Sequence, residues 1–159
     1  FMEWWSLGFR RLRPNRCTIL HRDYWQIEHH WKMSETILMF LFKGTPFKNL
    51  ISGLVGTKTG KYVFDDGYVA TERTLVEIGD YCTLNEFSIL QSHSMEDGIF
   101  KSAMVRLCAG TTVGSNTLFH YGVTTGEQTI IDSDCFVMKG ETLPEKTYWR
   151  GNPATQTSA

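Results

Sequence analysis

Several residue patterns that mark common protein classes are absent from this sequence of 159 residues. Its 4 cysteines form no C-x-x-C pair, so the sequence indicates neither a disulfide framework nor a zinc site. No apolar run reaches the roughly 18 residues that a membrane-spanning helix needs, and no signal peptide is visible. The net charge of −1 argues against bulk binding of nucleic acid. We therefore expect a reducing compartment, no disulfides and no nucleic-acid partner.

Motifs for phosphate loops, metals and nucleophiles are also missing. There is no Gly-rich phosphate loop and no Ser or Cys nucleophile motif. His21, His29 and His30 lack the partner spacing of a zinc site. The Asp65-Asp66-Gly67 segment reads as a turn in which both carboxylates are solvated. We expect no metal.

The sequence does contain a period of six residues from Leu107 to Ala154. The first positions are large and apolar with one exception, and they are Leu107, Val113, Phe119, Thr125, Ile131, Val137, Leu143 and Trp149. The fifth positions are mostly small or β-branched, and they are Thr111, Thr117, Val123, Thr129, Cys135, Glu141, Thr147 and Pro153. This period fits neither a helix nor a single strand. It fits a coil of three flat faces, stacked as parallel strands, with the large residue inside and the small one at the corner.

The same hexad pattern occurs upstream, but its register does not continue into the block that begins at Leu107. The upstream first positions are Ile78, Leu84 and Leu90. Because the spacing from there to Leu107 is not a multiple of six, we expect an insertion at about Met95 to Arg106. It is predicted to be an extruded loop that closes over a reactive groove. Cys82 and Cys135 hold fifth positions and are predicted to point inward as small apolar groups.

The N-terminal third differs from the repeats. Trp4 and Trp5 precede a group of arginines, an order that marks the cytoplasmic side of a membrane. The alternative is an irregular arm docked on the body with its arginines solvated. Helices are predicted at Tyr24 to Phe42 and at Phe47 to Val55, each apolar on one side. They are expected to cap the first coil and block its exposed edge, or else to lie on lipid.

These patterns divide the chain into four parts. They are a basic and aromatic membrane-proximal arm (1–23), a helical cap (24–56), a β-helix with an inserted loop (57–154, loop 95–106) and a tail (155–159). The chain begins at Phe1 rather than at methionine, which suggests a fragment of something longer.

His93 lies where the regular coils give way to the insertion, and is the main candidate for chemistry. A neutral imidazole at such a junction is suited to removing a proton from an attacking amine or hydroxyl. Glu96 and Asp97 are the nearby carboxylates that would orient it. The alternative is an ordinary surface histidine, and in either case its replacement is expected to leave folding intact. His120 either lines a neighbouring groove or is solvated.

The hexads that end in Trp149-Arg150-Gly151-Asn152-Pro153-Ala154 resemble the hexapeptide-repeat acyltransferases. That resemblance implies an all-β fold, a left-handed parallel β-helix, here with an N-terminal helical cap. In galactoside or maltose acetyltransferases, Thr-Gly-His or Thr-His-Pro supplies the catalytic histidine at the place that Gln91-Ser92-His93 occupies here. The resemblance also implies a donor arm along the wall, with Trp149, Arg150 and Asn152 bounding its channel.

A closer resemblance extends over most of the chain. Its segments are Tyr24-Trp25, 42–49, 75–80, 90–97, 105–107, 137–141 and 149–153. They are similar to the C-terminal part of poly-lysine-synthetase-type nonribosomal peptide synthetases. In that family, carrier domains and membrane helices accompany tandem β-helix domains implicated in joining an aminoacyl thioester to an amine. The match departs at Gly98, where Arg is frequent and a role in binding a substrate carboxylate is therefore in doubt, and at Cys108, where Gly is usual.

Three functions are compatible with these observations. The first is acyl transfer by one such condensing domain, with His93 as general base, a phosphopantetheine-bound aminoacyl thioester as donor and an amine as acceptor. The second is a non-catalytic β-helix that acts as a scaffold or oligomerisation module. The third is a free-standing coenzyme A-dependent acetyltransferase, with acyl-coenzyme A as donor. The expected partners are a carrier domain, a membrane-adjacent segment and further β-helix copies or a homo-oligomer, at the cytoplasmic face of the membrane.

Overall fold

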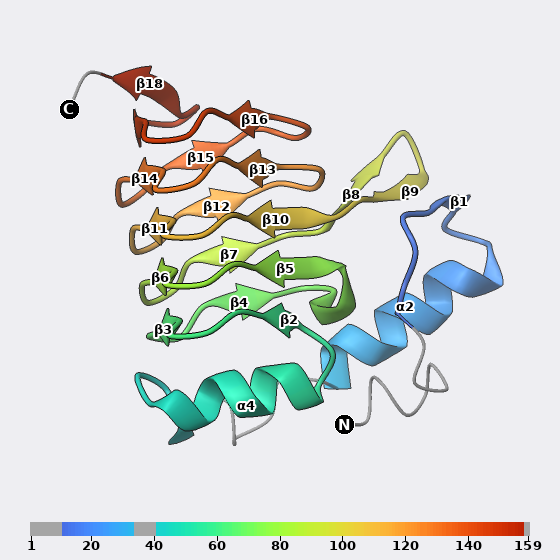
Figure 1. Cartoon of the computed structure of the whole chain (residues 1–159). Coiled ribbons are helices and arrows are strands. Elements are labelled where there is room, and N and C mark those ends of the chain that lie inside the picture. Colours follow the sequence, from blue (N-terminus) through green and yellow to red (C-terminus); the bar gives the residue numbers. More distant parts are fainter. Residues whose placement is uncertain (1–10, 34–40, 158–159) are drawn as a thin grey trace.

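The computed structural model describes residues 11–33 and 41–157, so predictions for the first ten residues lie outside it. Short parallel strands stack into three walls around a central core (Figure 1). Wall 1 contains β2 (Lys58–Thr59), β5 (Val76–Ile78), β10 (Val105–Leu107), β13 (Thr124–Thr125) and β16 (Thr142–Leu143). Wall 2 contains β3 (Phe64–Asp65), β6 (Thr83–Leu84), β11 (Thr112–Val113), β14 (Ile130–Ile131), β17 (Tyr148–Arg150) and the antiparallel β18 (Thr155–Thr157). Wall 3 contains β4 (Val69–Ala70), β7 (Ile89–Leu90), β12 (Leu118–Phe119) and β15 (Phe136–Val137).

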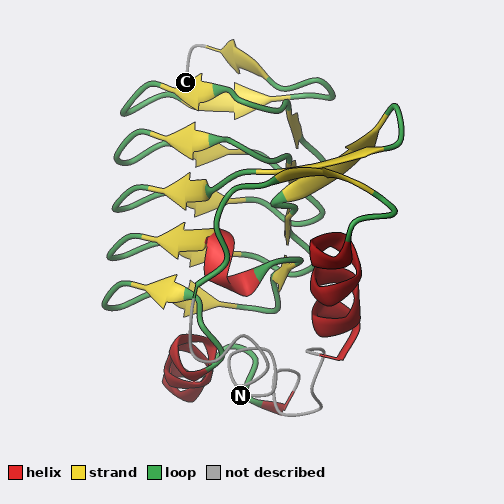
Figure 2. Ribbon diagram, turned by 90° about the vertical axis from the view of Figure 1, so that its right-hand side faces the viewer, coloured by secondary structure: helices red, strands yellow, loops and turns green. Residues whose placement is uncertain are grey.

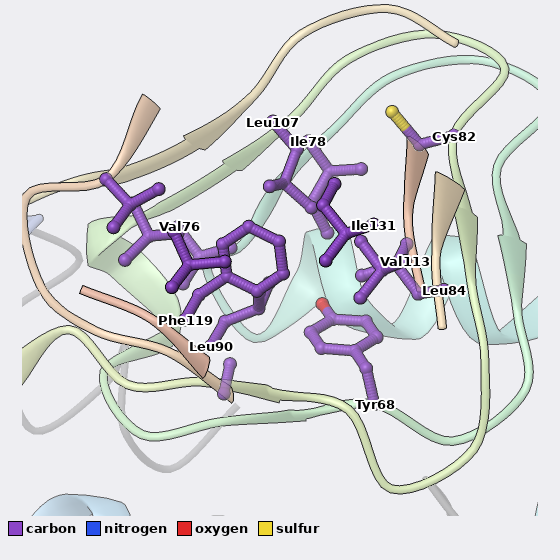
Figure 3. Packing of buried hydrophobic residues seen from close by; sticks show 14 of the residues in the cluster. Tyr68, Val76, Ile78, Cys82, Leu84, Leu90, Leu107, Val113, Phe119 and Ile131 are labelled. Atoms are coloured by element: carbon purple, nitrogen blue, oxygen red, sulfur yellow. The ribbon is translucent and has the colours of Figure 1, made fainter. Parts of the chain in front are cut away.

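The hexad positions lie where the period places them. First-position side chains from the three walls meet along the axis of the prism (Figure 3). Thr125, the polar exception, is also buried, and its hydroxyl accepts the Cys108 amide at 3.0 Å and bonds the Thr111 hydroxyl at 2.8 Å. Cys82 and Cys135 lie buried at corners, as predicted.

Glycine at a second hexad position is explained by the close approach of successive coils. A Cβ atom on Gly79 would lie 2.7 Å from the amide nitrogen of Ala109 in the coil above. Real Cβ atoms do not approach backbone so closely, so a larger residue here would push two coils apart.

The lower end of the prism is polar inside, and α4 (Pro46–Leu54) covers it. Lys48 of α4 is buried and its Nζ lies 2.6 Å from Oδ1 of Asp65, the inward residue of β3. The same oxygen accepts the Gly67 and Tyr68 amides. The expectation of a solvated Asp65 was therefore wrong: this carboxylate points inward because α4 supplies a buried cation.

The second predicted helix, Phe47 to Val55, corresponds to α4. The first corresponds to α2 (Arg22–Met33), and the rest of its predicted range, to residue 40, lies outside the described residues. Figures 1 and 2 show α2 beside the prism rather than beneath it. No helix among residues 11–33 and 41–157 is long and apolar enough to cross a membrane.

The predicted insertion is a β-hairpin that projects from the edge of the prism (Figure 1). It consists of β8 (His93–Glu96) and β9 (Ile99–Ser102), which pair antiparallel, and β1 (Arg16–Thr18) adds a third strand beside β9. The boundaries of 95–106 were wrong: the hairpin starts at His93, and Val105 and Leu107 are already buried in wall 1. The predicted arm (1–23) thus pairs with the hairpin at residues 16–18.

The buried ion pair under α4 gives a stability prediction. We expect Lys48→Met to destabilise the protein by about 3–5 kcal/mol, because it leaves Asp65 charged and unpaired in the interior. The double variant Lys48→Met/Asp65→Asn should recover most of that loss, since the amide needs no cation. Urea unfolding at neutral pH measures both free energies, and a double variant no more stable than the single one would contradict this account.

Candidate active site

The edge where wall 3 turns into wall 1 departs from the regular hexads, and the candidate site lies there. In the first coil this corner contains Glu72 and the short 3-10 helix η1 (Arg73–Leu75). In the second coil it opens into the β8–β9 hairpin. In the next two coils it contains Tyr121 and Gly140, whose backbones are joined by a hydrogen bond of 3.0 Å. Polar residues from four successive coils therefore share one edge.

His93 and Glu72 form the central interaction of this corner. The His93 Nδ1 atom lies 2.6 Å from Glu72 Oε1. The Glu72 side chain is only 1% exposed, and its other carboxylate oxygen accepts the Thr71 hydroxyl at 2.6 Å. Because a carboxylate only accepts, Nδ1 carries the proton and the lone pair of the neutral ring lies on Nε2. This is the arrangement that orients a histidine general base.

The carboxylate that orients His93 is therefore Glu72, and the prediction of Glu96 or Asp97 for that position was wrong. Asp97 lies exposed at the hairpin tip, in a left-handed conformation with φ 52°. Glu96 instead binds lysines. Its oxygens lie 2.6 Å from Lys101 Nζ and 2.5 Å from Lys139 Nζ.

The surroundings of His93 hold the pKa of its imidazole above the usual value. Burial of the ring acts to lower this pKa, but the hydrogen bond and charge of Glu72, aided by the charge of Glu28 on α2, outweigh burial and raise it. The ring also stacks on Phe100, with centroids 5.2 Å apart. The His93 side chain is 17% exposed, so it is more buried than expected. Replacing it would leave Glu72 short of a partner, at a cost of about 1–3 kcal/mol.

His120 belongs to the same edge, one coil above His93. Its ring lies against Tyr121 and Phe136, with centroids 4.9 and 5.9 Å away. Burial lowers the pKa of His120, and the nearby charges of Lys139 and His93 lower it further, against the effect of Glu96. His120 is thus a half-buried residue of the corner rather than a fully solvated one.

The proposed channel residues lie elsewhere in the prism. Trp149 and Arg150 belong to β17 in wall 2, away from the corner of His93. Trp149 packs against the core, Arg150 is exposed with its Nε 3.1 Å from Asp132, and Asn152 is exposed in the turn before β18. The structure does not bring them together with His93, and their role with a donor remains a prediction.

Glu72 is the residue that sequence reasoning missed. It lies in the segment between Ala70 and Val76 where the hexad phase is lost, so an acidic residue at a phase break was the available signal. The short distance between Glu72 and His93 could not be predicted from the sequence. It depends on the stacking of the two corners, in which the Thr71 hydroxyl accepts a hydrogen bond from the Ser92 amide at 3.0 Å.

No protein-family model matches the chain. The chain is 29% identical over 157 residues to delta-poly-L-ornithine synthetase of Acinetobacter baumannii, a match that covers 96% of this chain and 12% of that protein. The chain thus spans about one eighth of the length of the synthetase that it matches. This similarity confirms the predicted relation to poly-amino-acid synthetases.

Solved acetyltransferases share the architecture. Galactoside acetyltransferase in complex with coenzyme A aligns with a TM-score of 0.63 at 14% identity, over 91% of this chain and 86% of that one. Maltose O-acetyltransferase from Clostridium difficile aligns with a TM-score of 0.61 at 13% identity, over 98% and 95%. The chain has the fold of the hexapeptide-repeat acetyltransferases. The predicted fold class, a left-handed parallel β-helix with short N-terminal helices, is confirmed.

The His93–Glu72 pair gives a pH prediction. Glu72→Gln removes the main charge that raises the His93 pKa and leaves burial, so this pKa should fall below 6.5, the ordinary value for histidine. Measuring the pKa of His93 by NMR titration tests this, with Glu77→Gln on wall 1 as the matched control. An unchanged His93 pKa in Glu72→Gln would contradict the assignment.

The same pair should make stability depend on pH. Because the pKa of His93 is higher in the folded state than in the unfolded state, protonation of His93 stabilises the fold. This stabilisation is complete below the pKa of the unfolded state and is lost as the pH rises through the pKa of the folded state. The stability difference between wild type and Glu72→Gln should therefore be larger at about pH 5.5 than at about pH 9. Urea unfolding at the two pH values measures it, and an equal difference would count against the pair.

Proposed function

We propose that this chain catalyses acyl transfer from a thioester to an amine, with His93 as the general base. The observation that carries the proposal is the 2.6 Å contact between His93 Nδ1 and the buried Glu72 carboxylate. It leaves Nε2 as the only ring atom that can accept a proton. The fold supports the proposal by analogy, since acetyltransferases with this architecture bind coenzyme A.

The reaction needs one proton to leave the amine. As the amine nitrogen attacks the thioester carbonyl, Nε2 of His93 takes that proton and a new carbon–nitrogen bond forms. The carbon–sulfur bond then breaks, and the departing thiolate receives a proton back from the imidazolium. Glu72 stabilises the imidazolium between the two steps and keeps the ring oriented.

The charges around His93 favour an amine as acceptor. The two charges that raise the pKa of the imidazole, Glu72 and Glu28, are both negative. A cationic acceptor would be drawn to these carboxylates and would first lose one proton to solvent, so that the neutral amine attacks and gives its next proton to His93. The similarity to a synthetase named for delta-poly-L-ornithine supports the same reading: the chain would act as one domain of a nonribosomal peptide synthetase and form amide bonds.

The donor would be an aminoacyl group on the phosphopantetheine arm of a carrier domain, or an acyl-coenzyme A. The exposed cation Arg150 on β17 suits the phosphate of either donor, and Trp149 and Asn152 lie beside it. When bound, such a group supplies the activated thioester. The alignment over 95% of a maltose O-acetyltransferase also favours a free-standing, coenzyme A-dependent enzyme as second candidate.

The outer face of α4 supports placing the domain at a membrane surface. Phe47, Leu50 and Leu54 occupy one side of this helix and are 62%, 64% and 53% exposed, whereas Lys48 and Ser52 face the prism. The helix thus turns its polar side inward and its apolar side outward, the reverse of an ordinary surface helix.

A transfer assay tests the proposed activity. His93→Asn should lower the single-turnover rate from an aminoacyl-pantetheine donor to an amine by about 10²–10⁴-fold. The wild-type rate should rise with pH through an apparent pKa above 6.5, because only the neutral ring accepts a proton. His21→Asn, at an exposed histidine away from the corner, is the matched control.

Comparing two acyl donors in the same assay separates the candidate functions. A carrier-bound donor that reacts faster than acyl-coenzyme A favours the synthetase domain, and the reverse favours the free-standing enzyme. Equal rates for wild type and His93→Asn would remove His93 from the mechanism. No transfer by wild type from either donor would favour the non-catalytic scaffold.

Flotation with liposomes tests the placement at a membrane. Replacing Phe47, Leu50 and Leu54 together by Gln should reduce co-flotation with anionic vesicles without loss of folding, because all three side chains are exposed. The matched control replaces three exposed apolar residues of the prism, Phe64, Phe87 and Ile130. Equal flotation of wild type and the α4 variant would remove α4 from any membrane contact.

A further inference from the structure

The carboxylate of Glu96 sits between the hairpin and the prism and is contacted from both. From the hairpin itself, the Ser94 hydroxyl donates to Oε1 at 3.0 Å and Lys101 Nζ donates to Oε2 at 2.6 Å. From the corners above, Tyr121 OH donates at 3.3 Å and Lys139 Nζ at 2.5 Å, both to Oε1. One side chain of β8 is thus bonded to two further coils.

These contacts make Glu96 unsuitable as a proton carrier. Hydrogen bonds from Lys101, then Lys139, then Ser94 hold the pKa of Glu96 well below its usual range. A carboxylate whose folded-state pKa is lowered loses its stabilising contribution only as pH falls through that value. The Glu96 carboxylate therefore stays ionised over the pH range in which His93 titrates, so its contacts with the lysines do not act as a pH switch.

The position of the hairpin determines the surroundings of His93. Met95 pairs with Phe100 and Glu96 pairs with Ile99 across the hairpin. Phe100 is 1% exposed, and its ring lies between His93, at 5.2 Å, and Tyr24 of α2, at 5.5 Å. A tilt of the hairpin away from the wall would move Phe100 and leave the imidazole free to rotate about its contact with Glu72.

We propose that Glu96 is a positioning residue for the transfer reaction: it fastens the β8–β9 hairpin to the wall and thereby holds Phe100 against His93. This inference rests on the proposed function for its kinetic consequences, but its structural part does not. Glu96 acts through Phe100 rather than on the reacting atoms. Lys139, in the turn after β15, is the partner on the prism, and it lies 43 residues from Glu96 in the sequence.

Kinetics give the first test. Glu96→Gln and Lys139→Met should each lower the single-turnover transfer rate by about 10-fold, since a small displacement of a catalytic group is enough to do so. The apparent pKa of the rate should change less than in Glu72→Gln, because neither residue bonds the imidazole. The double variant should be no slower than the slower single variant, because both remove one fastening.

A second cycle separates positioning from general stability. Phe100→Leu keeps an apolar side chain but removes the ring that stacks on His93, so Glu96→Gln should cost little further rate in that background. Glu77→Gln, which breaks the ion pair of Glu77 with Arg106 on wall 1, is the matched control and should leave the rate unchanged. Additive losses from Glu96→Gln and Phe100→Leu would overturn the proposal.

An activity-free measurement keeps the inference distinct from the proposed function. In Glu96→Gln, amide exchange should accelerate in β8 and β9 but not in the walls, and the His93 ring protons should lose the upfield shift caused by Phe100. These changes in a protein without transfer activity would uphold the fastening while the proposed function fails. Unchanged exchange and unchanged His93 resonances would overturn the fastening even if His93 proves catalytic.

Discussion

Backbone hydrogen bonds between coils are the constraint on which the rest of this structure depends. Each inner strand of a wall bonds the strand above and the strand below, as when the Ile89 amide donates to the Thr117 carbonyl and the Leu118 amide to the Cys135 carbonyl. The coils must therefore lie in register, with every inward position above another inward position. This explains why buried threonine hydroxyls recur at corners: each bonds a carbonyl of its own or the next coil.

The candidate site occupies the edge where this regularity is interrupted. The buried side chains at regular corners are small, such as those of Thr111, Thr117 and Cys135. In the first coil the η1 turn interrupts this pattern, and the Glu72 carboxylate reaches His93 in the coil above. The hairpin then leaves the wall at His93, which frees one face of the imidazole from coil-to-coil contact. The strands that flank Glu72 and His93 pair in a fixed register. This pairing therefore fixes the position of the two side chains relative to each other.

Much of the fold follows from the hexad pattern, because a period of six and a second-position glycine encode the corner geometry directly. The inward residues from Ile78 to Leu143 and the two corner cysteines could be read from the sequence for that reason. At the non-repeating ends and edges, in contrast, the sequence pattern did not predict the contacts. Asp65 looked like a turn residue until α4 placed Lys48 against it, and Glu72 is 21 residues from His93, a separation that no local motif encodes. Interactions between a repeat and a non-repeating segment depend on docking, which spacing alone does not reveal.

The stacking also makes distance along the prism a matter of counting. One coil adds one strand spacing, about 4.8 Å, and β17 lies three strands above β6, in the coil of His93, so the Arg150 strand stands about 14 Å higher along the axis. A chain with one coil more or fewer between the hairpin and the tail would change that height by a single step and leave both the Glu72 corner and the α4 end untouched. The distance between the His93 corner and the Arg150 strand is thus a whole number of coil spacings, and the number of repeats sets it rather than any one side chain.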